Sequence, residues 1–188
     1  MEAFRNKRIV IGVTGSIAAY KGAELLRELT RAGAEVQVMM SEAATHFIGP
    51  LTLEALSGRP VMLDPLELQS DSRIGHIVAA DSADAILVAP ATARWLGAMA
   101  AGLANDIITA TCLASSAPVV VAPAMDGDMY VHPATAANVA RLREFGYASP
   151  NMVGYFPRMR ERGSDDIARP AGGATSRWAP PAPRPRRR

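Results

Sequence analysis

Residues 9–21 read IVIGVTGSIAAYK, and this segment sets the architecture of the chain. Residues 9–13 form an apolar, largely β-branched run of the kind that becomes a buried strand. The turn Thr14-Gly15-Ser16 follows, and apolar residues at helical spacing then continue to Gly33, a residue type that commonly ends a helix. A strand, a tight turn and a helix in this order predict the opening unit of an α/β fold.

The same pattern recurs along the chain. Further strands are predicted at residues 35–40, 84–89 and 118–122, and further helices at about 93–101, 106–115 and 133–145. Strands without polar alternation are buried on both faces, so the sequence predicts a doubly wound parallel sheet in a single α/β domain. Ligands bind at the carboxyl ends of such strands, which makes residues 14–18, 41–45, 90–94 and 123–130 the candidate binding loops.

The composition changes sharply near residue 148. Residues 148–188 contain half of the 14 prolines, and nine arginines against three acids. We therefore predict a globular domain over residues 1–147 and a Pro/Arg-rich tail over 148–188 that is disordered or aberrant. The domain has 11 basic and 15 acidic residues, so the net charge of +2 comes from the tail and does not favour nucleic-acid binding.

Cysteine content and hydropathy indicate the cellular compartment in which the protein is expected. The single cysteine, Cys112, excludes an internal disulfide framework and a Cys-based zinc cluster, and no metal site is predicted. Its apolar neighbours predict that it is buried. Neither a signal-peptide core nor an apolar run of about 20 residues is found, so we expect a cytoplasmic protein without a membrane partner.

Two local features indicate chemistry. Gly15 and Ser16 join a strand to a helix, where backbone N–H groups and the helix dipole favour an anion such as a phosphate, although an ordinary turn capped by Ser16 has the same pattern. His76 follows Gly75 at an expected helix start, where the dipole favours a neutral imidazole that accepts a proton. A structural capping role is the alternative for His76, and His46 and His132 are interpreted as structural.

Five segments occur in the order and spacing of one known family: TGSIAAYK at 14–21, GHI at 75–77, APATA at 89–93, GLAND at 102–106 and PAMDGDMY at 123–130. Over about residues 7–147 the chain resembles the flavin-dependent cysteine decarboxylases, and most of all their coenzyme A branch. The resemblance implies a flavodoxin-like fold, FMN as cofactor, and trimers or dodecamers of four trimers. The implied activity is that of a lyase, the oxidative decarboxylation of 4'-phosphopantothenoylcysteine to 4'-phosphopantetheine.

The resemblance also implies roles for individual residues. The implied FMN contacts are Gly15, Ser16 and Ile17 at the first turn, Ser41 and Thr45 for the phosphate or ribityl chain, and Pro90, Ala91, Thr92 and Ala93 on the far side. His76 matches the family's essential histidine, and Met125 and Asp126 lie in the motif that contacts substrate.

Three departures from the family pattern leave alternatives open. Asp126 and Arg94 stand where asparagines are usual, and an ionised Asp126 would repel a substrate carboxylate. The glycine-rich flap, which carries a cysteine in the coenzyme A branch, is not recognisable after Tyr147. The reaction is therefore expected to stop at an enethiol, and a flavin prenyltransferase-like protein or a non-catalytic FMN-binding regulatory subunit remain the alternatives.

Overall fold

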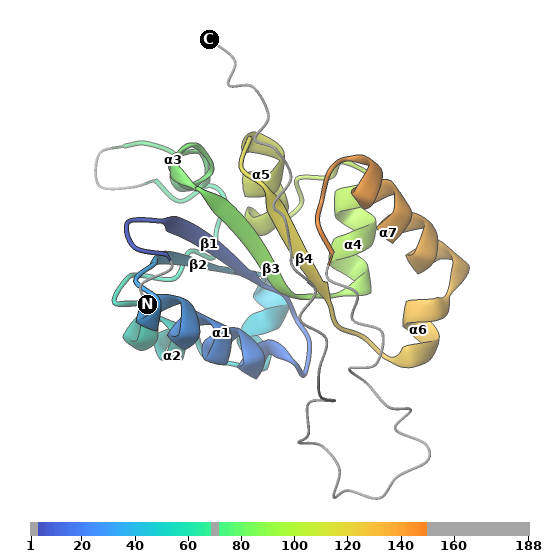
Figure 1. Cartoon of the computed structure of the whole chain (residues 1–188), viewed down its shortest axis with the longest axis horizontal. Coiled ribbons are helices and arrows are strands. Elements are labelled where there is room, and N and C mark those ends of the chain that lie inside the picture. The colour runs from blue at the N-terminus through green and yellow to red at the C-terminus, as the bar shows by residue number, and fades with distance from the viewer. Residues whose placement is uncertain (1–3, 69–71, 150–188) are drawn as a thin grey trace, which may run out of the picture.

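Four parallel strands form one sheet in the order β2-β1-β3-β4 (Figure 1). They are β1 (Arg8–Val13), β2 (Glu35–Met40), β3 (Ala85–Ala91) and β4 (Val119–Pro123). Ile9 of β1 lies opposite Val36 on one side and Ala85 on the other. The computed structural model describes residues 4–68 and 72–149, and within them the predicted doubly wound α/β fold is confirmed.

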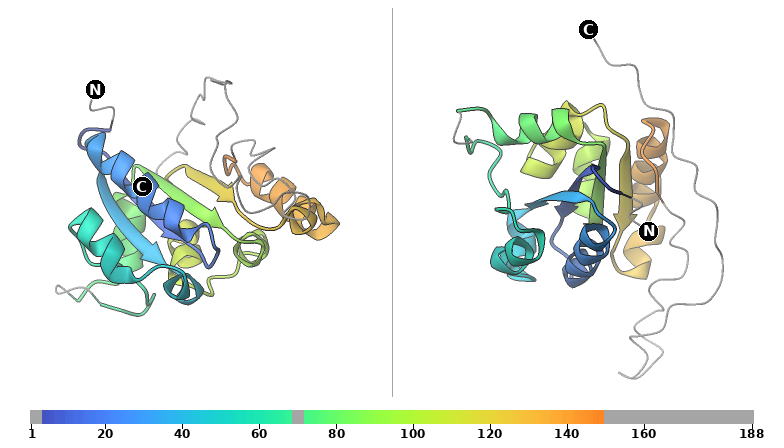
Figure 2. Two further views of the ribbon diagram at one scale, coloured as in Figure 1. Left: turned by 90° about the horizontal axis from the view of Figure 1, so that it is seen from below. Right: turned by 60° about the vertical axis from the view of Figure 1, so that its left-hand side comes forward.

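One face of the sheet is covered by α1 (Ala19–Arg31) and α2 (Pro50–Ser57). Alternate residues of β1 and β2 point into this core, where they meet Leu26 of α1 and Leu53 of α2. The blue and teal helices in the right-hand view of Figure 2 are these two, and they lie together on one side of the strands.

The opposite face is covered by α3 (Gly75–Ser82), α4 (Ala93–Ala100), α5 (Ile107–Ala114) and α7 (Pro133–Glu144). Its core contains Trp95, Ile108 and Leu142 together with inward residues of β3 and β4. A Cβ atom on Gly12 of β1 would lie 2.5 Å from Ile108 Cγ2, so α5 approaches the strand at a distance that only glycine permits.

Several elements differ from the sequence prediction. The 3-10 helix η1 (Glu42–His46), α2 and α6 (Gly127–Val131) were not predicted. Two residues could have predicted α2. Pro50 lies in its first turn, and Gly58 follows its last residue in a left-handed conformation with φ of 69°. Strand β3 continues two residues past its predicted end through Pro90, which follows a cis peptide bond, because the Pro90 carbonyl accepts a hydrogen bond from Thr14 N.

The sheet is extended by single residues at both edges. Met62 exchanges backbone hydrogen bonds with Val38 and Met40 of β2, and Ala148 does so with Val119 and Val121 of β4. The predicted domain boundary at residue 147 falls one residue before Ala148, and the predicted tail lies almost entirely outside the described residues. None of the described helices has both the length and the apolar character needed to cross a membrane.

Candidate functional site

Four loops meet at the carboxyl edge of the parallel sheet, which is where the sequence predicts binding. They connect β1 to α1, β2 to η1, β3 to α4 and β4 to α6. Ser41 N donates to Val13 O at 3.1 Å, joining the second loop to the end of β1. Ala124 N donates to Ala91 O at 2.9 Å, joining the third and fourth loops.

Thr14 joins the first loop to the third through its side chain. Its buried hydroxyl donates to Pro90 O at 2.7 Å and accepts from Thr92 N at 3.0 Å, and Thr14 N also donates to Pro90 O. Sequence reasoning gave Thr14 no role, because both partners lie more than 70 residues away and no local pattern indicates them.

The β1–α1 turn is compact at Gly15 and Ser16. A Cβ atom on Gly15 would lie 2.5 Å from Ala43 Cβ and 2.9 Å from the Ala43 carbonyl carbon, so this position accepts only glycine. Ser16 Oγ accepts from Ala18 N at 3.2 Å, and Ala18 rather than Ser16 is the N-cap of α1. Ile17, at 72% exposure, points away from the protein interior.

The hydroxyls of Ser41 and Thr45 differ in whether they can donate a hydrogen bond to a ligand. Ser41 is the N-cap of η1, but its side chain makes no capping bond, and its buried Oγ has no hydrogen-bond partner among the described residues. Thr45 Oγ1 donates to Glu42 O at 2.7 Å and keeps only its lone pairs for a ligand. A buried, unpaired hydroxyl is costly, and a ligand oxygen at this edge would satisfy it.

Pro90, Ala91, Thr92 and Ala93 are placed by the junction of β3 and α4. Pro90 and Ala91 lie in the strand, Thr92 caps α4 by accepting from Trp95 N, and Ala93 is the first residue of the helix. Arg94, which replaces the family's asparagine, is exposed.

His76 is the second residue of α3, in agreement with the predicted helix start. Its Nδ1 atom lies 2.9 Å from Pro65 O. A carbonyl oxygen can only accept, so the proton resides on Nδ1, and Nε2 is the ring atom that can take a proton.

Met125 and Asp126 lie on the loop after β4. Met125 is half-buried against the core, whereas Asp126 is exposed. Asp126 Oδ1 accepts from Asp128 N at 2.9 Å as the N-cap of α6, which fixes one carboxylate oxygen and leaves the other available. The geometry therefore gives Asp126 a structural bond in addition to any contact with a ligand.

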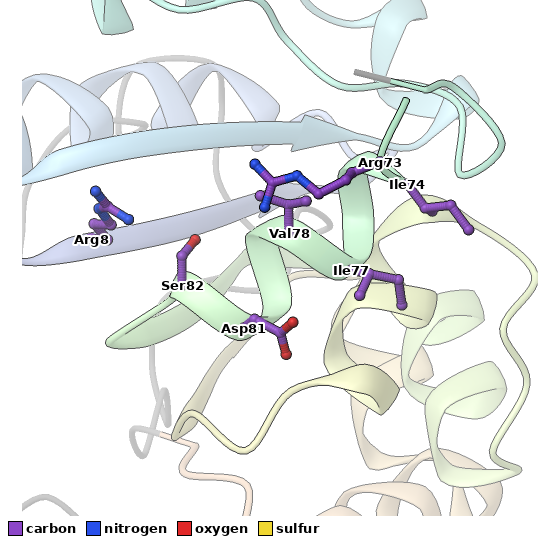
Figure 3. Close-up of a pocket in the computed structure, with 7 residues that line it drawn as sticks. All are labelled: Arg8, Arg73, Ile74, Ile77, Val78, Asp81 and Ser82. Atoms are coloured by element: carbon purple, nitrogen blue, oxygen red, sulfur yellow. The ribbon is translucent and has the colours of Figure 1, made fainter. Parts of the chain in front are cut away.

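A surface hollow of about 480 Å³ lies elsewhere, along the outer side of α3 (Figure 3). It is lined by Arg8, Arg73, Ile74, Ile77, Val78, Asp81 and Ser82. The figure shows Arg8 and Ser82 towards one end of α3 and Ile74 at the other. None of these residues belongs to the four loops, so the candidate binding site rests on the loops and not on this hollow. His76 lies on α3 beside the hollow, and its side chain is bonded to Pro65 O, outside the four loops.

Cys112 lies in α5 and is buried, as predicted. Burial, with a smaller contribution from the Asp106 carboxylate, raises the pKa of Cys112 to about 12. A thiol with this pKa stays protonated near neutral pH and has no access to the site loops, so it takes no part in their chemistry.

The loop residues fit a flavin with a phosphate. The Gly15–Ser16 turn lies just before α1 and packs closely on Ala43, and the Ser41 hydroxyl offers a buried donor without a partner among the described residues. Backbone N–H and hydroxyl donors of this kind suit a phosphate and a polyol chain. The order of the loops matches the expectation drawn from the sequence motifs.

The sequence is similar to those of known proteins. The model of the Flavoprotein family matches residues 2–161. The Coenzyme A biosynthesis bifunctional protein CoaBC of Vibrio cholerae is 49% identical over 147 residues, which are 78% of this chain and 37% of that protein. The CoaBC protein of Bacillus subtilis is 48% identical over 142 residues, which are 76% of this chain and 35% of that protein. The chain thus spans little more than a third of the length of these relatives.

Solved structures agree with the fold. The FMN-dependent cysteine decarboxylase SpaF is 33% identical with a TM-score of 0.73, over 79% of this chain and 85% of that one. A cysteine-to-serine mutant of PPC decarboxylase, complexed with pantothenoylaminoethenethiol, is 28% identical with a TM-score of 0.69, over 78% of this chain and 82% of that one. Because the family model matches most of its length, the chain belongs to the Flavoprotein family.

Proposed function

We propose that this chain is the FMN-dependent decarboxylase that converts 4'-phosphopantothenoylcysteine to 4'-phosphopantetheine in coenzyme A synthesis. Membership of the Flavoprotein family makes a flavin the cofactor, and FMN is the form proposed here. The observation that carries the proposal is the unpaired, buried Ser41 hydroxyl at the sheet edge where Gly15 meets Ala43. The similarity to the CoaBC proteins and to SpaF supports the same substrate chemistry.

The proposed roles of the residues follow from their placement. Ser41 and the backbone N–H of Gly15 hold the FMN phosphate, and Thr45 accepts from the ribityl chain, whereas the Ser16 N–H is already donated to Thr14 O. Pro90, Ala91, Thr92 and Ala93 form the opposite wall. His76 Nε2 accepts a proton from the substrate, while the Pro65 carbonyl fixes the orientation of the ring.

When bound, FMN supplies a two-electron acceptor for the substrate cysteine. Removing a hydride equivalent from Cβ and the thiol proton gives a thioaldehyde, and its C=S group withdraws the electron pair that remains after CO₂ leaves. The product would be an enethiolate, and a proton on its sulfur would give the enethiol. Met125 is the proposed contact that positions the cysteine end of the substrate. The second oxygen of Asp126 is the proposed acceptor for a substrate N–H group, since it would repel the substrate carboxylate.

The proposal also includes a homo-oligomer of this chain, which is either a trimer or an assembly of four trimers. Around the first two loops, Ile17 is 72% exposed, Leu51 is 76% exposed and Phe47 is 51% exposed. Large apolar side chains gathered beside a binding loop are typical of an interface, and a second copy of the chain is the proposed cover.

Absorbance spectroscopy of the purified protein tests the cofactor. We expect a yellow protein that releases FMN when denatured, and whose apoprotein regains the colour when FMN is added. The holoprotein should then release CO₂ from 4'-phosphopantothenoylcysteine. A colourless protein that FMN cannot reconstitute would refute the proposal, and a yellow protein without CO₂ release would favour the non-catalytic alternative.

A further inference from the structure

We infer that Thr14 is the positioning residue of the flavin site, because its hydroxyl holds the β1–α1 turn and the β3–α4 loop at one separation. The inference rests on the proposed function and deepens it. Thr14 itself is not proposed to react with substrate or cofactor.

The geometry of the hydroxyl is that of a two-sided bridge. It donates to Pro90 O at 2.7 Å and accepts from Thr92 N at 3.0 Å, while Thr14 is only 2% exposed. A hydroxyl is the smallest side-chain group that can donate and accept at once, so no apolar residue of the same shape can replace it. Burial removes water as a substitute partner.

Thr14 also joins two of the loops through a side chain. Its backbone N–H donates to Pro90 O, and this bond, like those from Ser41 to Val13 and from Ala124 to Ala91, persists whatever the side chain is. What the hydroxyl adds is a second bond to Pro90 O and the bond from Thr92 N. The regular β1–β3 pairing ends at Gly12 and Val88, and Thr14 continues the connection beyond it. The two loops it joins carry Gly15 and Ser16 on one side and Thr92 and Ala93 on the other, which are the proposed opposite walls of the flavin site.

The hydrogen bonds of Thr14 also affect α4, the helix that follows the β3–α4 loop. Thr92 accepts from Trp95 N as the N-cap of α4, and its own N–H is held by Thr14. Releasing that N–H frees the cap residue to move, and with it the first turn of α4. A displacement there changes the wall of the flavin site without removing any atom that would contact flavin.

The test compares Thr14→Val, which keeps the shape and removes the hydroxyl, with Thr14→Ser, which keeps the hydroxyl. Thr111→Val is the matched control, since the Thr111 hydroxyl is equally buried and both its partners, Ile107 O at 2.7 Å and Met39 Sδ at 3.1 Å, lie outside the four loops. FMN dissociation constants are measured by fluorescence titration of each apoprotein. Hydrogen exchange of the peptide containing Thr92 is measured without FMN.

Thr14→Val is expected to raise the FMN dissociation constant about tenfold and to speed hydrogen exchange at Thr92. A tenfold change corresponds to the free energy expected for one buried N–H left without a hydrogen-bond partner. Thr14→Ser should restore both values to within about threefold, and Thr111→Val should alter neither. Either unchanged FMN affinity in Thr14→Val or an equal loss of FMN affinity in Thr111→Val would overturn the role of Thr14. The proposed function would stand in both cases. Failure of the unmodified protein to bind FMN would overturn the proposed function and this role together.

Discussion

The hydrogen bond between His76 and Pro65 decides which nitrogen of the imidazole can accept a proton. The Pro65 carbonyl accepts a hydrogen bond from Nδ1–H, so Nε2 is the nitrogen that can take a proton. The position at the second residue of α3 was predictable from the Gly75-His76 pattern. The partner was not, since Pro65 lies on a different segment, 11 residues earlier, and no periodicity links the two.

Replacing His76 with asparagine tests the proton-accepting role. Asn keeps a hydrogen-bonding side chain but has no basic nitrogen, so CO₂ release should fall by about a hundredfold or more while FMN content stays the same. The comparison variant is His46→Asn, on the exposed end of η1, which should keep activity within about twofold. Activity in His76→Asn within a few-fold of the unmodified protein would reduce His76 to a structural residue that ties α3 to Pro65.

At the scale of the elements, the sheet and most helices follow directly from local sequence. Each predicted strand is present, because β-branched runs without polar alternation have few other stable environments. The elements that were missed, η1, α2 and α6, are short, and their ends depend on proline, glycine and Asp126 rather than on apolar periodicity. The hydrogen bonds that join the site loops to one another were not predicted either. They connect segments that are distant in the chain, so no local pattern indicates them.

Close packing of β1 against α5 leads to a prediction about stability. Gly12→Ala would place a methyl group 2.5 Å from Ile108 Cγ2, and overpacking of this kind costs about 1–3 kcal/mol. Thermal or denaturant unfolding should therefore show a lower free energy of unfolding for Gly12→Ala. Gly127→Ala, at the first residue of α6, is the control, because a Cβ atom there meets nothing within 4 Å.

A double-mutant cycle with Ile108→Ala identifies the cause. The double variant should lose at least about 1 kcal/mol less than the sum of the single variants, since the truncated side chain makes room for the added methyl group. Strict additivity would show that the alanine acts on β1 by some route other than contact with Ile108.

For the whole molecule, the chemistry of the one cysteine limits the proposed reaction. Cys112 is buried in α5, and burial raises its pKa to about 12, so the thiol stays protonated near neutral pH. The cysteine-to-serine mutant of PPC decarboxylase was solved with an enethiol, pantothenoylaminoethenethiol. A chain whose thiol cannot reach the site should likewise leave the enethiol unreduced.

Mass spectrometry of an anaerobic single turnover measures this outcome. The expected product is two hydrogens lighter than 4'-phosphopantetheine, because CO₂ has left and the final reduction has not occurred. The Cys112→Ser variant should give the same product, since the buried thiol has no part in the reaction. Formation of the saturated thiol by the unmodified chain would show that another group donates the final proton.

The order of the strands also affects how the protein forms during synthesis. Ile9 pairs with Val36 and with Ala85, and these partners emerge from the ribosome at very different times. Closing the longer loop costs about 0.9 kcal/mol more conformational entropy than closing the shorter one, by the logarithmic dependence on loop length. The β1–β2 half can therefore pair first, while the other side of β1 stays open to solvent. The nascent chain exposes that bare strand edge until β3 is translated, which is the interval in which it is most vulnerable to aggregation.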